Sequence, residues 1–173
     1  MLNYRKIEAG DDAQLAEIIR ANLEKYHLNI PGTVYFEPEL NHLSKYYGSD
    51  PQKRVYYIAL GENGEMIGGV GAAEFTGIPD CAELQKLYLT DSAKGKGYGK
   101  ALVDFLIRTY SGRYAVLQVG TGDSPSTIPF YEVCGFRRHH LVKNFFTDHY
   151  DHPIYECGVQ LVDMVYLQRK IGT

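Results

Sequence analysis

A glycine-rich segment flanked by lysines is the part of this 173-residue sequence best suited to bind a charged ligand. Residues 94–100 have the sequence Lys-Gly-Lys-Gly-Tyr-Gly-Lys and follow an apolar strand pattern at 84–89. A helical pattern begins directly afterwards, at 101–107. Glycines at alternate positions leave backbone N–H groups accessible, and the start of a helix carries a partial positive charge. The segment therefore predicts a phosphate-binding loop.

Two common nucleotide-binding motifs do not fit this loop. Counted from Gly95 and Gly97, the dinucleotide fingerprint needs a third glycine where this sequence has Lys100. A Walker loop needs Ser or Thr where the sequence has Ala101, and a glycine where it has Lys94. Two alternatives stay open at this point: a structural turn without a ligand, and a nucleotide- or DNA-binding loop that depends on the lysines.

The loop resembles the coenzyme A pyrophosphate loop of the GNAT superfamily of N-acetyltransferases, whose pattern is Arg or Gln, two residues, Gly, one residue, then Gly or Ala. Lys94 stands where the family usually has Arg or Gln, which keeps the charge but loses the planar fork. Residues 119–136 end in a Phe-Tyr…Gly-Phe signature and resemble the family's fifth strand and fourth helix. Because two motifs in the right order are more specific than either alone, the sequence is identified as a member of this superfamily. The resemblance implies a bacterial-type acetyltransferase of small molecules or peptides.

The resemblance implies that acetyl-CoA is the co-substrate and indicates which residues hold it. The cofactor-binding residues implied are Leu87, Tyr88, Leu89, Lys94, Gly95, Lys96, Gly97, Tyr98, Gly99, Lys100, Asp123 and Ser126. In this family the fourth strand is splayed by a bulge and offers its main chain to the pantetheine arm, so an N–H group within 87–89 is a candidate oxyanion donor. Asp123 replaces a common asparagine and can accept, but not donate, a hydrogen bond. It is alternatively a helix cap, with Ser124 or Ser126 as rivals.

Acetyl transfer to an amine needs a neutral amine, a polarised carbonyl and a proton for the departing thiolate. Tyr131 matches the family tyrosine that often protonates the thiolate; an ordinary core tyrosine is the alternative. Glu83 precedes the bulged strand, where many relatives carry a carboxylate, and is the candidate general base. Glu74 on the neighbouring strand competes with it, and an exposed surface carboxylate is the alternative for each. Strand alternation puts Glu83 and Gln85 on one face and Lys86 on the other, unless the bulge intervenes.

Composition and charge narrow the range of partners. The chain is 45% hydrophobic and 23% charged with a net charge of −3, which gives no general electrostatic reason to bind nucleic acid or an anionic membrane. Neither a signal-peptide core nor a bilayer-length apolar stretch occurs, so we expect a cytoplasmic protein. The three cysteines suggest buried thiols, and no metal is expected. Four histidines between 139 and 152 lie in an aromatic segment that either lines the acceptor pocket or packs on the sheet.

Hydrophobic periodicity and turn residues predict a single domain over residues 1–173. The expected strands cover 2–7, 54–60, 66–75, 81–89, 114–119, 136–142 and 159–168. Helices are expected from residue 11 or 12 to 26, and at 38–47, 97–110 and 126–134, with an irregular segment at 143–158. Glycines at 68, 69 and 71 indicate a bulge or a close approach. The order matches the GNAT order, an α/β (α+β) fold with a mixed, mostly antiparallel sheet of about seven strands, splayed at the fourth and fifth, and about four helices.

The leading functional hypothesis is an N-acetyltransferase that moves an acetyl group from acetyl-CoA to a primary amine by direct attack in a ternary complex. The acceptor is a small-molecule or peptide amine that the sequence does not identify further. A CoA-binding sensor or interaction module without catalytic activity is the alternative function. No nucleic acid or membrane partner is expected, and a homodimer stays open.

Overall fold

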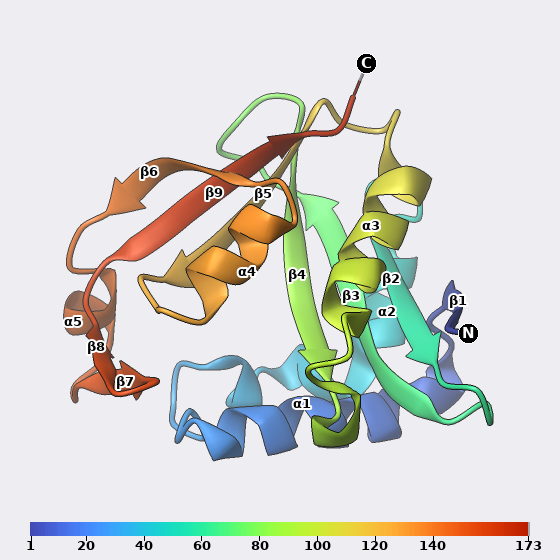
Figure 1. Ribbon diagram of the computed structural model, residues 1–173, viewed down its shortest axis with the longest axis horizontal. Helices are drawn as coiled ribbons and strands as arrows, with labels where there is room; N and C mark the ends of the chain where they lie inside the picture. The colour runs from blue at the N-terminus through green and yellow to red at the C-terminus, as the bar shows by residue number, and fades with distance from the viewer. Residues whose placement is uncertain (173) are drawn as a thin grey trace.

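The computed structural model describes residues 1–172, which form a seven-stranded sheet with helices on both faces and a separate two-stranded hairpin (Figure 1). The strands are β1 (Asn3–Lys6), β2 (Val55–Leu60), β3 (Met66–Glu74), β4 (Cys81–Leu89), β5 (Val116–Gly122), β6 (Arg137–Val142), β7 (Ile154–Glu156), β8 (Val159–Leu161) and β9 (Met164–Lys170). The α-helices are α1 (Asp12–Lys25), α2 (Leu43–Gly48), α3 (Tyr98–Tyr110), α4 (Thr127–Val133) and α5 (Phe145–His149). Short 3-10 helices cover Ala9–Asp11, Val34–Phe36, Pro38–His42 and Asp91–Ala93.

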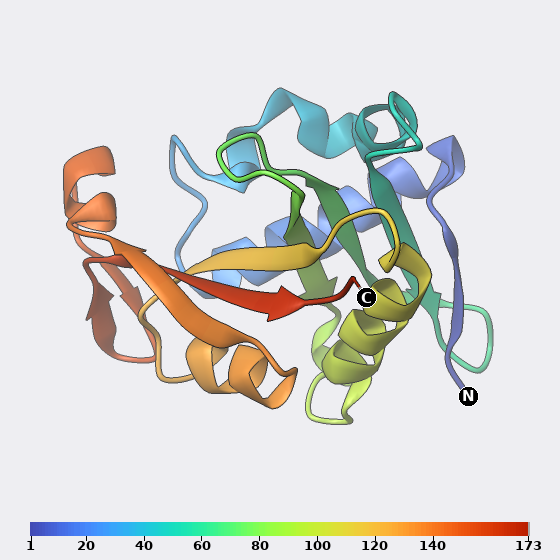
Figure 2. The same ribbon diagram turned by 90° about the horizontal axis from the view of Figure 1, so that it is seen from above.

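Helices pack on the sheet through apolar stripes of helical spacing. In α1, Leu15, Ile19 and Leu23 are buried, and in α3 the buried residues include Leu102 and Leu106. Figure 2 shows α1 and the segment around α2 on one face of the sheet and α3 and α4 on the other. We call the face of the sheet covered by α1 the α1 face, and the opposite face, covered by α3 and α4, the α3 face.

The sheet separates in its middle, between β4 and β5. Its order is β1-β2-β3-β4-β5-β9-β6, and every neighbouring pair is antiparallel except β4 with β5. That parallel pair is in register only from Cys81 to Glu83 on β4 and from Val116 to Gln118 on β5. Beyond this point the strands diverge into a V (Figure 1). The predicted mixed sheet, splayed at its fourth and fifth strands, is confirmed.

A bulge in β4 lies on one arm of this V. The register between β3 and β4 shifts between Gly69 and Gly71, and Lys86 has a left-handed φ of 50°. Gly71 also allows a close approach, because a Cβ atom there would lie 2.6 Å from the hydroxyl oxygen of Tyr47. The bulge turns Lys86 toward Glu37, on the face where Gln85 contacts Tyr47. Strict alternation is thus broken, and consecutive side chains face α2.

Several sequence-based boundaries need correction. Residues 143–158, expected to be irregular, contain α5 and β7, and the single strand expected at 159–168 is divided into β8 and β9. The helix expected at 38–47 begins as a 3-10 helix at Pro38 and becomes α-helical only at Leu43. Cys81 and Cys134 are buried as expected, but Cys157 is exposed at the β7–β8 turn. Within the described residues, no helix is both long and apolar enough to span a bilayer.

Candidate active site

The glycine-rich loop places a row of free backbone donors at the start of α3. Gly95 and Gly97 have φ values of 75° and 79°, which only glycine adopts without strain, and a Cβ atom at either position would meet no neighbouring atom within 4 Å. The N–H groups of residues 95–100 have no hydrogen-bond acceptor within the described chain. Free N–H groups combined with the helix dipole suit a phosphate.

The three lysines of the loop have different surroundings. The ammonium of Lys94 donates to Asn22 Oδ1 at 2.6 Å and to Asp91 Oδ1 at 2.9 Å, so it points beneath the loop. Lys100 pairs with Asp104 at 2.6 Å along the helix. Lys96 is exposed and has no ion pair among residues 1–172, which leaves it as the cation available to a ligand.

Asn22 is a site residue that sequence reasoning missed. It lies on α1, is 9% exposed, and donates from Nδ2 to the carbonyl oxygens of Ile18 and Leu89 at 2.9 Å each. Since its Oδ1 accepts from Lys94, one amide links α1, the end of β4 and the loop. The signal in the sequence was a polar residue on the apolar stripe of a helix.

Tyr131 reaches the α3 side of the V from α4. Its ring is 9% exposed and packs edge-on against Phe130 and Phe136. Burial, and next to it the nearby Tyr88, raise the pKa of Tyr131 well above its ordinary value. Burial also raises the pKa of Tyr88 to about 12, and the charge of Glu37 adds to this shift. Tyr131 therefore holds its proton at neutral pH, as a general acid must.

Leu87 and Leu89 pack on the core of the α3 face, whereas Tyr88 packs on that of the α1 face. Leu87 and Leu89 share the α3-face core with Tyr131, which comes from α4. The predicted residues 87–89 are thus brought together with Tyr131.

Glu83 lies at the vertex of the V, because its partner Gln118 is the last residue of β5 in register with β4. Burial raises the pKa of Glu83, an effect partly opposed by a hydrogen bond with Gln85 and by the charge of Lys86. Gln85 accepts in turn from the Tyr47 hydroxyl at 3.0 Å. Sequence reasoning missed Tyr47, which sits on a separate helix. The carboxyl thus has a fixed neighbourhood and a proton affinity suited to a base.

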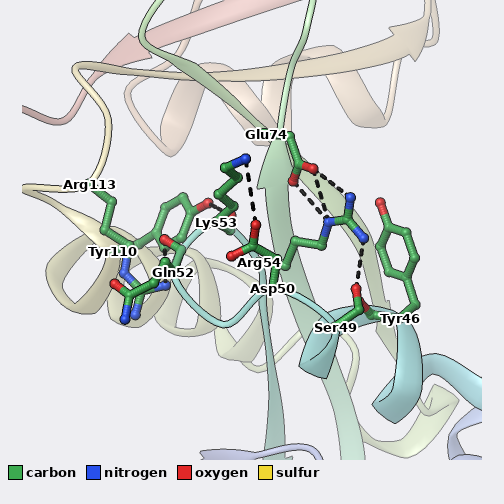
Figure 3. A network of polar contacts seen from close by, with 9 residues as sticks. All are labelled: Tyr46, Ser49, Asp50, Gln52, Lys53, Arg54, Glu74, Tyr110 and Arg113. Carbon is green, nitrogen blue, oxygen red and sulfur yellow. Dashed lines mark hydrogen bonds and ion pairs between the residues drawn. The ribbon is translucent and has the colours of Figure 1, made fainter.

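Glu74, the competing base, lies one residue beyond Ala73, the cross-strand partner of Glu83, and belongs to a structural network with Arg54. Arg54 donates to both of its carboxylate oxygens, at 2.9 and 2.5 Å, and its guanidinium also lies 4.6 Å from the ring centre of Tyr46 (Figure 3). The hydrogen bonds from Arg54 lower the pKa of Glu74. A carboxylate held in this way is a poor proton acceptor, so Glu83 is the better candidate.

The remaining predicted residues lie at the edges of the site. Asp123 follows β5 and pairs with Arg138 at 3.3 Å, and it does not cap α4. Ser126 is the residue before α4, and its N–H donates to Ser124 Oγ at 3.2 Å. Tyr150, from the histidine-rich segment, lies close to Gly32 on the α1 face: a Cβ atom added to Gly32 would be 3.8 Å from the Tyr150 ring. Nowhere in 1–172 do three or more His, Cys, Asp or Glu side chains gather as a metal site would require.

Known proteins resemble this chain in sequence and fold. The model of the acetyltransferase (GNAT) family matches residues 17–136. The chain belongs to this family. A relative from Bacillus subtilis, the N-acetyltransferase YvbK, is 32% identical over 128 residues, which cover 69% of this chain and 82% of that protein. The predicted superfamily and enzyme class, an N-acetyltransferase, are confirmed.

Solved GNAT structures share the fold over nearly the whole chain. A Bacillus subtilis acetyltransferase in complex with CoA is 25% identical with a TM-score of 0.73, and the match covers 98% of this chain and 99% of that one. A GNAT phosphinothricin acetyltransferase from Sinorhizobium meliloti in complex with acetyl-CoA is 26% identical with a TM-score of 0.74, covering 99% and 89%. The splayed sheet described above is therefore the GNAT fold.

Proposed function

We propose that this GNAT protein transfers an acetyl group from acetyl-CoA to a primary amine by direct attack within a ternary complex. The observation that carries the proposal is the separation of β4 from β5 beyond Glu83, at the vertex of the V (Figure 1). Tyr131 packs in the core of the α3 face, as do Ala82 and Leu84, so strand alternation turns Glu83 toward the α1 face. Donor and acceptor can then occupy the site together, entering from the α3 face and the α1 face.

The donor side supplies phosphate contacts and a path for the thioester. The free N–H groups of residues 95–100 and the exposed Lys96 would hold the pyrophosphate. The pantetheine arm would then follow β4 at 87–89, where an N–H group polarises the thioester carbonyl. Lys94 takes no direct part, because its ammonium is held by Asn22 and Asp91; it acts by supporting the loop. Solved relatives that bind CoA or acetyl-CoA support this assignment.

The chemistry needs one base and one acid. Glu83 accepts the proton of the acceptor's ammonium, directly or through water, and the neutral amine attacks the carbonyl carbon. The C–S bond breaks as the attacking nitrogen loses its second proton and the amide forms. Tyr131 donates its proton to the departing thiolate and regains one from that nitrogen, directly or through water. A protonated phenol on the donor side and a carboxylate at the vertex match these two roles.

Initial rates with acetyl-CoA and a panel of amines and N-terminal peptides test the proposal. Direct attack predicts intersecting lines in double-reciprocal plots and no acetylated enzyme when acetyl-CoA is given alone. Parallel lines, or a stable acetyl-enzyme, would overturn direct attack. Tight CoA binding without turnover of any amine would instead favour the sensor function.

A further inference from the structure

A polar cavity of about 280 Å³ lies on the α1 face, away from the phosphate-binding loop. Its lining consists of Glu37, Glu39, Leu43, Tyr46, Gln85 and Lys86. The bulge in β4 produces this lining, since it brings Gln85 and Lys86 to the same face. The opposite wall comes from the segment between α1 and α2, which supplies both glutamates.

This cavity adjoins the candidate catalytic groups. Gln85 lines it and lies two residues from Glu83 on β4, a spacing of roughly 6.5 Å along an extended strand. On the other side of the cavity, burial raises the pKa of Tyr88 in the V and of Tyr150 in the C-terminal segment, and the charge of Glu37 adds to both shifts. A molecule in the cavity can thus present one end to Glu83.

The charges in the cavity favour a cation. Two carboxylates line it against one ammonium. Glu83 adds a third carboxylate on the same face, because its neighbours Ala82 and Leu84 pack in the core of the α3 face. The Lys86 side chain is 17% exposed, and its Nζ lies 3.2 Å from Glu37 Oε2. The Lys86 side chain is itself a primary ammonium on an alkyl chain, and it lies beside Glu37. Lys45 and His42 line an adjoining cavity on the far side of Tyr46.

We propose that the acceptor is a diamine, with one nitrogen presented to Glu83 and the second, as an ammonium, held by Glu37 and Glu39. The inference rests on the proposed acetyl transfer and specifies its acceptor. Lys86 competes with the second ammonium for Glu37. An acceptor with a carboxylate in that place would need Lys86 for binding and would face two glutamates. Loss of Lys86 should therefore strengthen the binding of a diamine and weaken the binding of an acceptor that carries a carboxylate.

Calorimetric binding to the CoA-saturated protein tests this with three ligands of one chain length: 1,4-diaminobutane, n-butylamine and 4-aminobutanoate. Wild type should bind the diamine at least tenfold more tightly than either analogue. Glu37→Gln should remove this preference, and the melting temperature of the variant, compared with that of wild type, controls for folding. Lys86→Met should strengthen diamine binding several-fold, because Glu37 loses its internal partner.

Any one of four results would overturn the diamine site. Wild type could bind the three ligands equally, bind none of them, or bind 4-aminobutanoate more tightly, and Lys86→Met could bind the diamine more weakly. Acetylation of the same ligands is measured separately. A diamine preference without acetylation would refute the proposed function but keep the cation site. Acetylation without a diamine preference would do the reverse.

Discussion

Glu83 and Glu74 lie on neighbouring strands and have opposite electrostatic surroundings. Burial raises the pKa of Glu83, whereas the hydrogen bonds from Arg54 lower that of Glu74. A carboxyl with a raised pKa binds protons more tightly in the folded chain, so it destabilises the fold as pH rises from its unfolded pKa through its folded pKa. The ionised carboxylate of Glu83 is therefore useful to catalysis as a base but lowers the stability of the folded chain.

Glu83→Gln should separate these two effects. We expect kcat/KM for acetyl transfer to fall by about 10²–10⁴-fold, the usual contribution of a general base. The acid limb of the pH–rate profile should disappear, because no carboxyl remains to be protonated there. The melting temperature at neutral pH should rise or stay level, since a buried ionised group is removed. Unchanged kcat/KM would exclude Glu83 as the base.

Glu74→Gln is the matched control on the adjacent strand. It removes charge-assisted hydrogen bonds with Arg54, which should lower the free energy of unfolding by about 1–2 kcal/mol. Because the folded pKa of Glu74 is lowered, this stability is present above the unfolded pKa and is lost as pH falls through the folded pKa. Denaturation at pH 7 and in acid should therefore show a loss that shrinks on acidification. Catalysis by the folded variant should stay within twofold of wild type, and a larger loss would return Glu74 to the active site.

Tyr131→Phe should affect chemistry without affecting cofactor binding. The ring packing against Phe130 and Phe136 is kept, and only the hydroxyl is removed. We expect kcat to fall by about 10²-fold through loss of the acid that protonates the thiolate. Affinity for CoA, measured by calorimetry, should stay within twofold. A loss of CoA affinity with unchanged kcat would instead make Tyr131 a binding residue.

At the scale of elements, α1 supports the phosphate-binding loop through Asn22. Asn22→Ala removes its amide, which leaves the Leu89 carbonyl and the Lys94 ammonium with fewer partners in a buried place. The free energy of unfolding should fall by about 1–3 kcal/mol, and the affinity for CoA should fall because the loop loses its support. Asn41→Ala is the control, since Asn41 is an exposed asparagine that accepts one hydrogen bond from Arg20. Equal CoA affinities in the two variants would contradict the role of Asn22.

The elements closest in sequence to the phosphate site were the most predictable. The strand, loop and helix from 81 to 110 are continuous, so periodicity and glycine spacing locate them without tertiary information. Asn22 reaches the site from α1, Tyr47 from α2 and Glu37 from the segment between these helices. No local sequence pattern places these elements near β4. The strand β7 was missed, and β8 was merged with β9, because three residues are too short to show a separate alternation.

At the scale of the molecule, the V divides the sheet into two parts that pair over a short stretch. β4 and β5 are in register at three residue pairs, Cys81–Glu83 with Val116–Gln118, and α3 and α4 lie beside the V on the same face. A ligand that contacts the loop, β4 and the start of α4 would connect both parts. Binding energy of this kind adds directly to folding stability, because the unfolded chain has no such site.

Saturating CoA should therefore raise the melting temperature by about 10 °C. A ligand at a thousand times its Kd adds about 4 kcal/mol, and a chain of this size gains roughly 2–4 °C per kcal/mol. Double-stranded DNA at the same phosphate concentration should give no shift, because Lys94 and Lys100 are paired within the protein and the net charge is −3. Differential scanning fluorimetry with both ligands measures this. A shift with DNA that persists when CoA is saturating would mean that the loop lysines bind nucleic acid, and no shift with CoA would mean that the V is not a cofactor site.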